Sequence, residues 1–333
     1  IIFLAILLLP LNINALTIGN RVLTENEYTN LVNLGFDDVS ISMMSDEEFY
    51  ANKDLEAEIV AQDSVYFRTY VYAKNQITMR YYDEEDDDYY YVNEEITKEE
   101  YENSDRQSVM PLDTSNPVDT TYKNLVTTLS YVSSTKRYRA NSTLKWKKMP
   151  KTRSYDIFAM SVNPSVSEVL MNSQHAYSTY EIKDYCRNKT VSSNKMNHDS
   201  DTWRKNANGT GVTFKLPESW AESFRWDETK NIPYPCENTI NKIGKMGNVL
   251  IDYDAINLQS ILYFDLVKVS KAPLSVYGDY QHAQKSVSLS AAANFSISFD
   301  KGNLGPSISI SSTTSEKYDH MSSTHIQILN PKW

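Results

Sequence analysis

Residues 121–147 read TYKNLVTTLSYVSSTKRYRANSTLKWK, which contains two strand-like runs with a short turn between them. Thr121–Val132 and Lys136–Lys147 are rich in β-branched and aromatic residues, and Ser133–Thr135 separates them. Two such runs joined by a few turn residues predict a β-hairpin. In the second run, apolar and small residues alternate with cations, so we expect one face in a core and a cationic face outside.

Strand-like segments recur through the rest of this half of the chain. They are Ser154–Val162, Gln174–Ile182, Gly211–Leu216, Ser260–Val269, Leu274–His282, Ser286–Phe299 and Ser307–Ser312. No long helical pattern separates them, which argues against a parallel α/β sheet. The 24 tyrosines and only 9 glycines among 333 residues also suit half-buried sheets. The sequence therefore predicts a mainly β fold, an antiparallel β-sandwich of jelly-roll type, with a small N-terminal helical hairpin.

A second, longer alternation stands at Ser286–Phe299, SVSLSAAANFSISF. Its apolar residues occupy every second position and most residues between them are serines, which predicts one strand of 14 residues with a hydroxyl face. A turn and the run SISISSTTS follow, so Ser286–Ser312 is expected to form an amphipathic hairpin. Pore-forming proteins insert such hairpins into membranes. A sandwich hairpin whose serines face water has the same pattern, and the three consecutive alanines favour it.

The chain begins with an apolar run, Ile1–Leu11, that is too short to span a bilayer comfortably. Ile13 and Ala15 stand where signal peptidase reads its substrates, so residues 1–15 are expected to be a signal peptide. No later apolar run approaches about 18 residues, so we expect no transmembrane span after its removal. The expected location is outside the cell or at its surface.

Charge divides the rest of the chain. Residues 17–105 hold 23 acidic and 6 basic residues, a net charge of −17, whereas the other residues sum to +7. Such asymmetry suggests surfaces with different partners. We expect an acidic helical hairpin at residues 16–60, an acidic strand and loop segment with a linker at 61–118, and the β-sandwich domain at 119–333.

Two short helices are expected in the first of these segments. Thr24–Glu27 is a capping box, and Gly35 is placed to end the helix in the left-handed conformation. Ser45–Glu48 repeats the start signal. About 35 residues cannot form a stable core alone, so we expect this hairpin to dock on another part of the protein.

The densest charge in the chain is YYDEEDDDYYYVNEE, Tyr81–Glu95. Carboxylates suit calcium, but the spacing and the central glycine of an EF-hand loop are missing. A solvated acidic loop, followed by a linker at Asn103–Asn116, is the favoured interpretation. We therefore expect no metal site.

The clearest candidate site is a basic stretch, Lys136–Arg153, with eight cations and no acid. Alternate residues of a strand stand about 7 Å apart, a spacing that suits a linear polyanion or a glycan of the cell envelope. The candidate residues, called the basic strip below, are Arg137, Arg139, Lys145, Lys147, Lys148, Lys151 and Arg153. Two alternatives stay open. The cations keep an exposed strand from pairing with other chains, or the acidic N-terminal hairpin docks on them.

No catalytic motif of weight is present, because the sequence lacks a phosphate-binding loop, a dinucleotide fingerprint, a nucleophile elbow and a zinc-protease motif. We therefore expect no cofactor, no catalytic residue and no nucleic-acid partner. Cys186 with His198 or His282 would make a thiol and imidazole pair, but nothing places the cysteine beside its base. In an oxidising compartment Cys186 and Cys236 either form a disulfide or stay separate thiols, and both alternatives remain open.

Four segments resemble uncharacterised secreted proteins of low-GC Gram-positive gut bacteria. They are LTENEYTNLVNLGF (23–36), MSDEEFYANKDLE (44–56), TLKWKKMPKTRSYDIFAM (143–160) and VYGDYQHAQKSVSLS (276–290). The resemblance covers these segments only. It implies an exported protein of a Gram-positive bacterium and brings no catalytic residue.

Three functions follow from the sequence, in this order. The first is a secreted or surface-associated, non-enzymatic protein that binds an anionic envelope polymer or glycan through the basic strip. The alternative is a pore-forming or membrane-inserting protein that uses Ser286–Ser312. The second alternative is a hydrolase of cell-wall polymers, with Trp220, Trp226 and Asp227 bordering a cleft.

Overall fold

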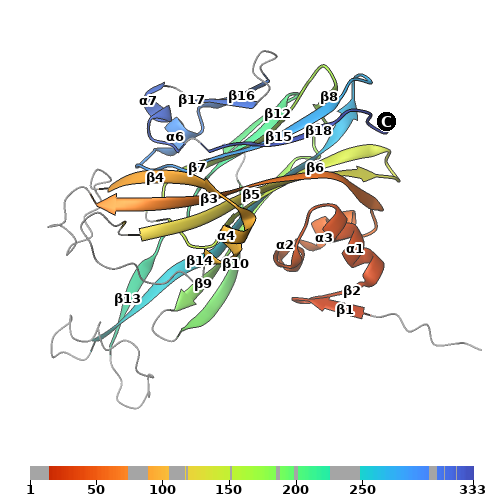
Figure 1. Ribbon diagram of the computed structural model, residues 1–333. Helices are drawn as coiled ribbons and strands as arrows, with labels where there is room; N and C mark the ends of the chain where they lie inside the picture. Colours follow the sequence, from red (N-terminus) through yellow and green to blue (C-terminus); the bar gives the residue numbers. More distant parts are fainter. Residues whose placement is uncertain are drawn as a thin grey trace, which may run out of the picture.

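The computed structural model describes residues 15–73, 89–104, 117, 119–150, 152–184, 188–198, 202–225, 248–299, 306–310, 312–319 and 321–333. Figure 1 shows two layers of strands, with a helical unit beneath one layer and a small separate hairpin above the other. The antiparallel β-sandwich predicted from the sequence is therefore confirmed. Within these ranges, no helix is both long and apolar enough to cross a membrane.

The larger sheet has nine strands in the described part of the chain, in the order β10-β9-β14-β6-β5-β3-β4, with β8 and β13 paired on β14. Its strands are β3 (Ala57–Ala73), β4 (Tyr89–Ile96), β5 (Asp119–Val132), β6 (Arg137–Trp146), β8 (Ser167–Val169), β9 (His175–Asp184), β10 (Lys189–Asn197), β13 (Trp220–Arg225) and β14 (Asn248–Lys268). β3 pairs with both β4 and β5, so the acidic segment and the basic half of the chain share this sheet.

The smaller sheet has five strands among the described residues, in the order β11-β12-β7-β15-β18. They are β7 (Tyr155–Val162), β11 (Trp203–Asn206), β12 (Gly209–Lys215), β15 (Leu274–Gln281) and β18 (Thr324–Ile328). β7 lies at its centre, between β12 and β15.

β5 and β6 form the hairpin predicted from residues 121–147, with Leu125 opposite Leu144. Period-two alternation turns Tyr138, Leu144 and Trp146 inward, and each is exposed by 2% or less. Burying one large apolar side chain stabilises the fold by about 2 kcal/mol, so these three side chains of β6 contribute substantially to the stability of the core.

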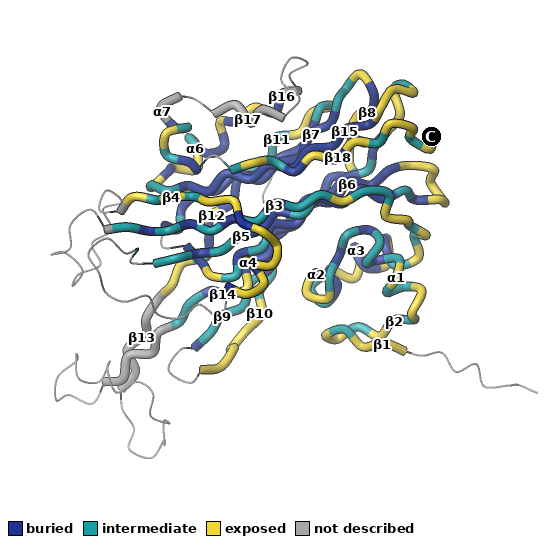
Figure 2. Tube along the Cα trace, in the orientation of Figure 1, coloured by how far each residue is buried: buried dark blue, intermediate teal, exposed yellow. Residues whose placement is uncertain are grey.

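The main core lies between the two sheets. It includes Leu125 and Trp146 from the larger sheet and Phe158, Val276 and Tyr280 from the smaller one. In Figure 2 buried residues lie along the strands of both layers. Many of the exposed residues lie in the turns and on α4 (Lys98–Glu102).

The N-terminal module, residues 15–56, holds β1 (Ala15–Ile18), β2 (Arg21–Thr24), α1 (Glu25–Asn33), α2 (Asp38–Met43) and α3 (Asp46–Asn52). Thr24 caps α1 in the predicted capping box, and Gly35 follows the helix with φ +91°. The expectation of two helices is wrong, because the described module has three. Asp37 caps α2 by accepting a 2.9 Å hydrogen bond from the Ser40 amide. A capping box usually has Glu or Gln as the third residue of the helix, and α2 has Ser40 there. The start of this helix was therefore not recognised from the sequence.

The single 14-residue strand expected at Ser286–Phe299 is wrong. The segment instead forms α6 (Leu289–Ala292) and then β16 (Phe295–Phe299), which pairs with β17 (Pro306–Ile310) before α7 (Ser312–Ser315). Ser288 caps α6, accepting a 3.3 Å hydrogen bond from the Ala291 amide. Alanine is the best helix former, so three consecutive alanines overrode the alternation locally. The predicted strand Ser307–Ser312 likewise ends at Ile310.

Several sequence predictions fall on residues outside the described ranges. They are the signal segment 1–14, the acidic loop 74–88, most of the linker at 105–116, Lys151, Cys186, Cys236, Trp226 and Asp227. Trp220 begins β13. These predictions stay predictions.

Candidate functional site

The outer face of β6 is the first candidate site, because it carries Arg137, Arg139 and Lys145 of the basic strip. The other four strip residues follow the strand, which ends at Trp146, so the single row of cations expected from the sequence is not formed. The structure places the N-terminal module on this face, and Leu34, Phe36 and Phe49 of the module pack with Ile261 and Tyr263 of β14. Figure 1 shows α1, α2 and α3 beneath β6, on the side away from the smaller sheet. The acidic N-terminal module therefore docks on the strand that carries part of the basic strip, which was one of the alternatives left open by the sequence.

Arg139 is the best-paired cation of the strip. Its guanidinium donates to both carboxylate oxygens of Asp265, at 2.7 and 3.2 Å, and to the Asn52 side chain of the module. The residue is 8% exposed and its guanidinium lies over the Tyr263 ring. A bidentate, buried pair of this kind has its donors satisfied inside the protein.

Two carboxylates of the module meet cations of the sheet. Asp37 pairs with Lys145 at 2.5 Å, and Glu48 pairs with Lys195 at 3.0 Å. Burial raises the pKa of Asp37, but the charge and hydrogen bond of Lys145 and the hydrogen bonds of Ser40 outweigh burial, so this pKa lies below its ordinary value. Charge complementarity therefore adds to apolar packing in this interface.

Of the remaining strip residues that the structure describes, three are bonded within the chain and Arg137 is the exception, while Lys151 lies outside the described residues. Lys147 donates to the carbonyl oxygens of Tyr101 and Glu102, Lys148 pairs with Asp119, and Arg153 forms a bidentate pair with Asp254. Arg137 is exposed, and no ion pair to it is present among the described residues. In this conformation a polyanion on the strip competes with all these partners.

We predict that Arg139→Met lowers the free energy of unfolding by about 2 kcal/mol, because Asp265 and Asn52 then lose a buried partner. Arg137→Met, two residues away on the same strand and exposed, is the matched control and should change it by about 0.5 kcal/mol or less. Chemical denaturation measures both. Equal effects of the two variants would contradict the importance of this contact for docking.

The outer face of the smaller sheet carries the second candidate site, the β16–β17 hairpin. The two strands pair with each other and with no other strand of the described chain. Figure 1 shows this hairpin with α6 and α7 above β7 and β15, on the side away from the larger sheet. In the described chain the hairpin is a separate two-stranded sheet that contributes no strand to either sheet of the sandwich.

The hairpin is held by its apolar face. Phe295 and Ile297 are 4% exposed and pack on Ile157 and Ala159 of β7, together with Ala292 of α6. Gly211 of β12 makes room, since a Cβ there would lie 2.8 Å from the Phe295 ring. The intervening residues Ser286, Ser288, Ser290, Asn294 and Ser296 are exposed, so the serines face water wherever the structure describes them.

The segment that carries the hairpin leaves and rejoins the sandwich at one point. Ala283 and Tyr318 form an isolated antiparallel bridge, the Gln284 amide donates to the Lys317 carbonyl at 2.8 Å, and the Asp319 amide donates to the His282 carbonyl at 2.9 Å. We call residues 282–284 with 317–319 the neck, and residues 285–316 the excursion. The excursion thus has a closed base.

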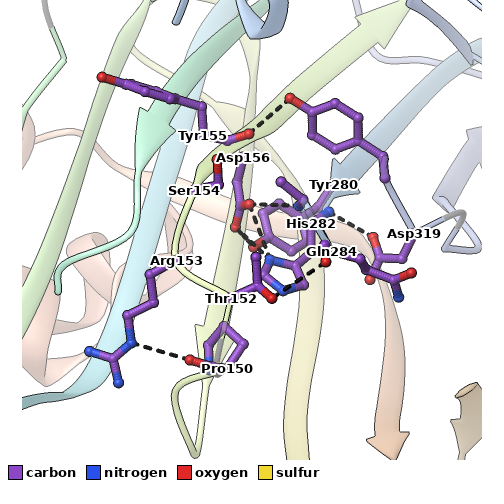
Figure 3. A network of polar contacts seen from close by, with 12 residues as sticks. Pro150, Thr152, Arg153, Ser154, Tyr155, Asp156, Tyr280, His282, Gln284 and Asp319 are labelled. Carbon is purple, nitrogen blue, oxygen red and sulfur yellow. Dashed lines mark hydrogen bonds and ion pairs between the residues drawn. The ribbon is translucent and has the colours of Figure 1, made fainter. Parts of the chain in front are cut away.

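A buried polar cluster surrounds the neck (Figure 3). Asp319 pairs with Lys123 of β5, both side chains being fully buried, and also accepts a hydrogen bond from the His282 amide. His282 Nδ1 lies 3.1 Å from Asp156, which accepts further hydrogen bonds from Tyr280 and from the Ala283 amide. Burial and the neighbouring Asp156 raise the pKa of Tyr280 well above its ordinary value, so this phenol stays a donor.

The Asp156 and His282 pair resembles two members of a hydrolytic triad, but the third is missing from the described residues. His282 Nε2 is buried and has no hydrogen-bond partner there, so no described hydroxyl is activated by it. The other histidine considered from the sequence, His198, lies against Phe214, and burial lowers its pKa to about 4. The hydrogen bonds and the ion pair of the neck cluster join β5, β7 and β15 to the base of the excursion.

No protein-family model matches the chain, and no curated protein is similar to it. Among solved structures it is similar to a pore forming protein, at 12% identity over 63% of this chain and 87% of the other, with a TM-score of 0.21. Clostridium perfringens delta-toxin (7%, 65% and 85%, TM-score 0.16) and the pilin SpaD from Corynebacterium diphtheriae (10%, 67% and 56%, TM-score 0.17) are similar to it at the same level. These likenesses are too weak to assign a function.

Proposed function

We propose that this is an exported, non-enzymatic protein that inserts an amphipathic hairpin, contained in the excursion, into membranes. The observation that carries the proposal is the docking of the β16–β17 hairpin. It is a separate two-stranded sheet, held on a finished sandwich through Phe295 and Ile297, with Ser296 turned to water. Besides this apolar contact the described hairpin accepts one long hydrogen bond, 3.4 Å from the Asn206 side chain of β11 to the Ile297 carbonyl. An element bound mainly by its apolar face can exchange that contact for lipid.

The length of the segment supports the same proposal. Continuing the register of β16 and β17 by four residues pairs Ala291 with Thr314 and gives two strands of nine residues. A membrane-spanning strand needs about 9–11 residues. The apolar alternation already runs through residues 287–299, and only α6 interrupts it. A change of α6 from helix to strand therefore produces a membrane-length hairpin with a hydroxyl face.

Release of the hairpin is compatible with an intact sandwich. Its strands share no ladder hydrogen bonds with either main sheet in the described chain, so both sheets keep their pairing when it leaves. The cost is the apolar area of Phe295, Ile297, Val287 and Ala292, which returns to an apolar environment in lipid. The hydrogen bonds of Ser154 with the Val287 backbone, and of Asn206 with the Ile297 carbonyl, are also lost. Insertion thus replaces one buried state by another.

The test is dye release from phosphatidylcholine vesicles, with and without phosphatidylserine, by the chain from Leu16 onward. We expect release by the wild type and at least a tenfold loss in Ile297→Asp, since a charged side chain on the lipid-facing side destabilises a membrane-spanning strand. Ser296→Asp places the same charge on the hydroxyl face and should keep most of the activity. Circular dichroism checks that both variants fold. No release by the folded wild type on either membrane would reject the proposal.

Binding of an anionic envelope polymer by the basic strip stays a prediction. The docked module resembles such a partner, because it presents Asp37, Glu48 and Asn52 to the cationic face. A polymer gains access only when these contacts open. The geometry therefore favours membrane insertion, for which the hairpin is already assembled.

A further inference from the structure

One buried acidic group lies on the face that the hairpin covers. Asp279 of β15 stands opposite Ala159 of β7, and Ala159 belongs to the apolar cluster that holds Phe295 and Ile297. Alternation puts Asp279 on this outer face, while its neighbour Tyr280 points into the main core. Asp279 is 7% exposed although it lies on the outside of the sandwich. The backbone of β17 lies close to β15, and Phe295 and Ile297 of β16 pack with Ala159 opposite Asp279, so we infer that the excursion covers this carboxyl group.

No cation among the described residues forms an ion pair with this carboxyl group. The charged group that acts on it there is a second carboxylate, Asp319 at the neck. Lys123 of β5 is already paired with Asp319, and His282 faces Asp156 of β7. Three carboxyl groups therefore share this region with one lysine and one histidine, so charge on Asp279 is unfavourable in the docked state.

The direction of the pH effect follows from this placement. Burial, and then the charge of Asp319, raise the pKa of Asp279 to about 7, from an ordinary value of 3.8. When the excursion leaves, the side chain meets water and regains its ordinary pKa. The protonated Asp279 carboxyl therefore contributes its full stabilisation of the docked state below about pH 4. This stabilisation is lost as the pH rises to about 7.

We propose that Asp279 is a charge-operated release switch: ionisation of its carboxyl, beneath the hairpin and beside Asp319, drives the excursion off the sandwich. The inference rests on the proposed function for its purpose, though release itself does not depend on membranes. It assigns the docked form to acidic surroundings and the released form to neutral ones. The sandwich sheets do not need to open.

Hydrogen exchange on the full chain from Leu16 onward tests the switch. Protection factors, corrected for the intrinsic pH dependence of exchange, are compared between pH 5 and 7.5 for β16–β17 and for β5 as an internal reference. We expect the opening equilibrium of the hairpin to rise on the order of 50-fold, as linkage with these two pKa values gives. β5 should change much less. A hairpin that changes in parallel with β5, or not at all, would overturn the inference.

Two variants separate the charge from its surroundings. Asp279→Asn keeps the shape and removes the charge, so opening should become nearly independent of pH. Glu316→Gln removes an exposed carboxyl of the same excursion and should leave the wild-type response. If the Asn variant does not fold, the wild-type protein alone decides. An opening equilibrium of the hairpin that does not change between pH 5 and 7 contradicts the switch.

The same proteins in the vesicle assay keep the two proposals apart. Opening that depends on Asp279 without dye release by any protein would reject membrane insertion and keep the switch. Dye release that is equal at pH 5 and 7.5, and equal in Asp279→Asn, would reject the switch and keep membrane insertion.

Discussion

Replacing Lys123 by Met is expected to lower the free energy of unfolding by about 4 kcal/mol. The Lys123 ammonium is fully buried, pairs with Asp319, and lies 4.9 Å from the centre of the Trp146 ring. Methionine fills a similar volume, so little of the loss comes from a cavity. The loss comes from Asp319, which remains buried with no cation beside it.

Chemical denaturation at pH 7 measures this effect, and a double variant is the control. Lys123→Met with Asp319→Asn removes both charges, while the Asn oxygen can still accept from the His282 amide. We expect the double variant to recover at least half of the loss, because a buried pair replaced as a whole costs little. A loss under 1 kcal/mol in the single variant would show that water reaches the pair.

The surroundings of Lys123 show which features of the fold the sequence predicts and which it does not. Positions 121–147 alternate clearly enough to predict the hairpin and the inward face of its second strand. Lys123 stands on that inward face, in line with Leu125 and Leu129. A cation at a core position requires a buried acid, but the acid that pairs with it, Asp319, is 196 residues away in the chain. Their pairing is a property of the tertiary fold, which period-two patterns do not encode.

The basic strip illustrates the same limit at the surface. Its cations and the acidic module were both visible in the sequence, and their docking was one of the alternatives. The pairing of Asp37 with Lys145, and of Asn52 with Arg139, depends on where α2 and α3 sit on the sheet. Since a long-range contact has no local signal, sequence reasoning could offer the docked arrangement but not choose it.

The excursion is the case in which the pattern and the fold disagree. Alternation through residues 286–299 predicts one long strand, whereas Ser288 and the alanines form α6. The structure shows a helix followed by a short strand, and the membrane-length strand that the alternation predicts belongs to the proposed function. Local sequence rules are expected to fail at functional or strained sites.

Gly211→Ala is expected to shift the hairpin toward the released state by about 3 kcal/mol, or about a hundredfold. A Cβ at this position would lie 2.8 Å from the Ala159 Cβ and 2.8 Å from the Phe295 ring. Ala159 is fixed in the centre of the sheet, so the hairpin is the neighbour that gives way. Hydrogen exchange at pH 6 should show the loss of protection in β16 and β17, with β5 unchanged.

Faster dye release by Gly211→Ala would connect this docking contact with membrane insertion. Adding Phe295→Leu removes the ring atoms that the new methyl group meets, so the double variant should regain much of the protection of the hairpin. If Gly211→Ala leaves hairpin protection unchanged, the hairpin adjusts in place and its docking is not limited by this contact. If protection falls equally in β5, the substitution destabilises the sandwich itself, and a hairpin that leaves independently of the two sheets is contradicted.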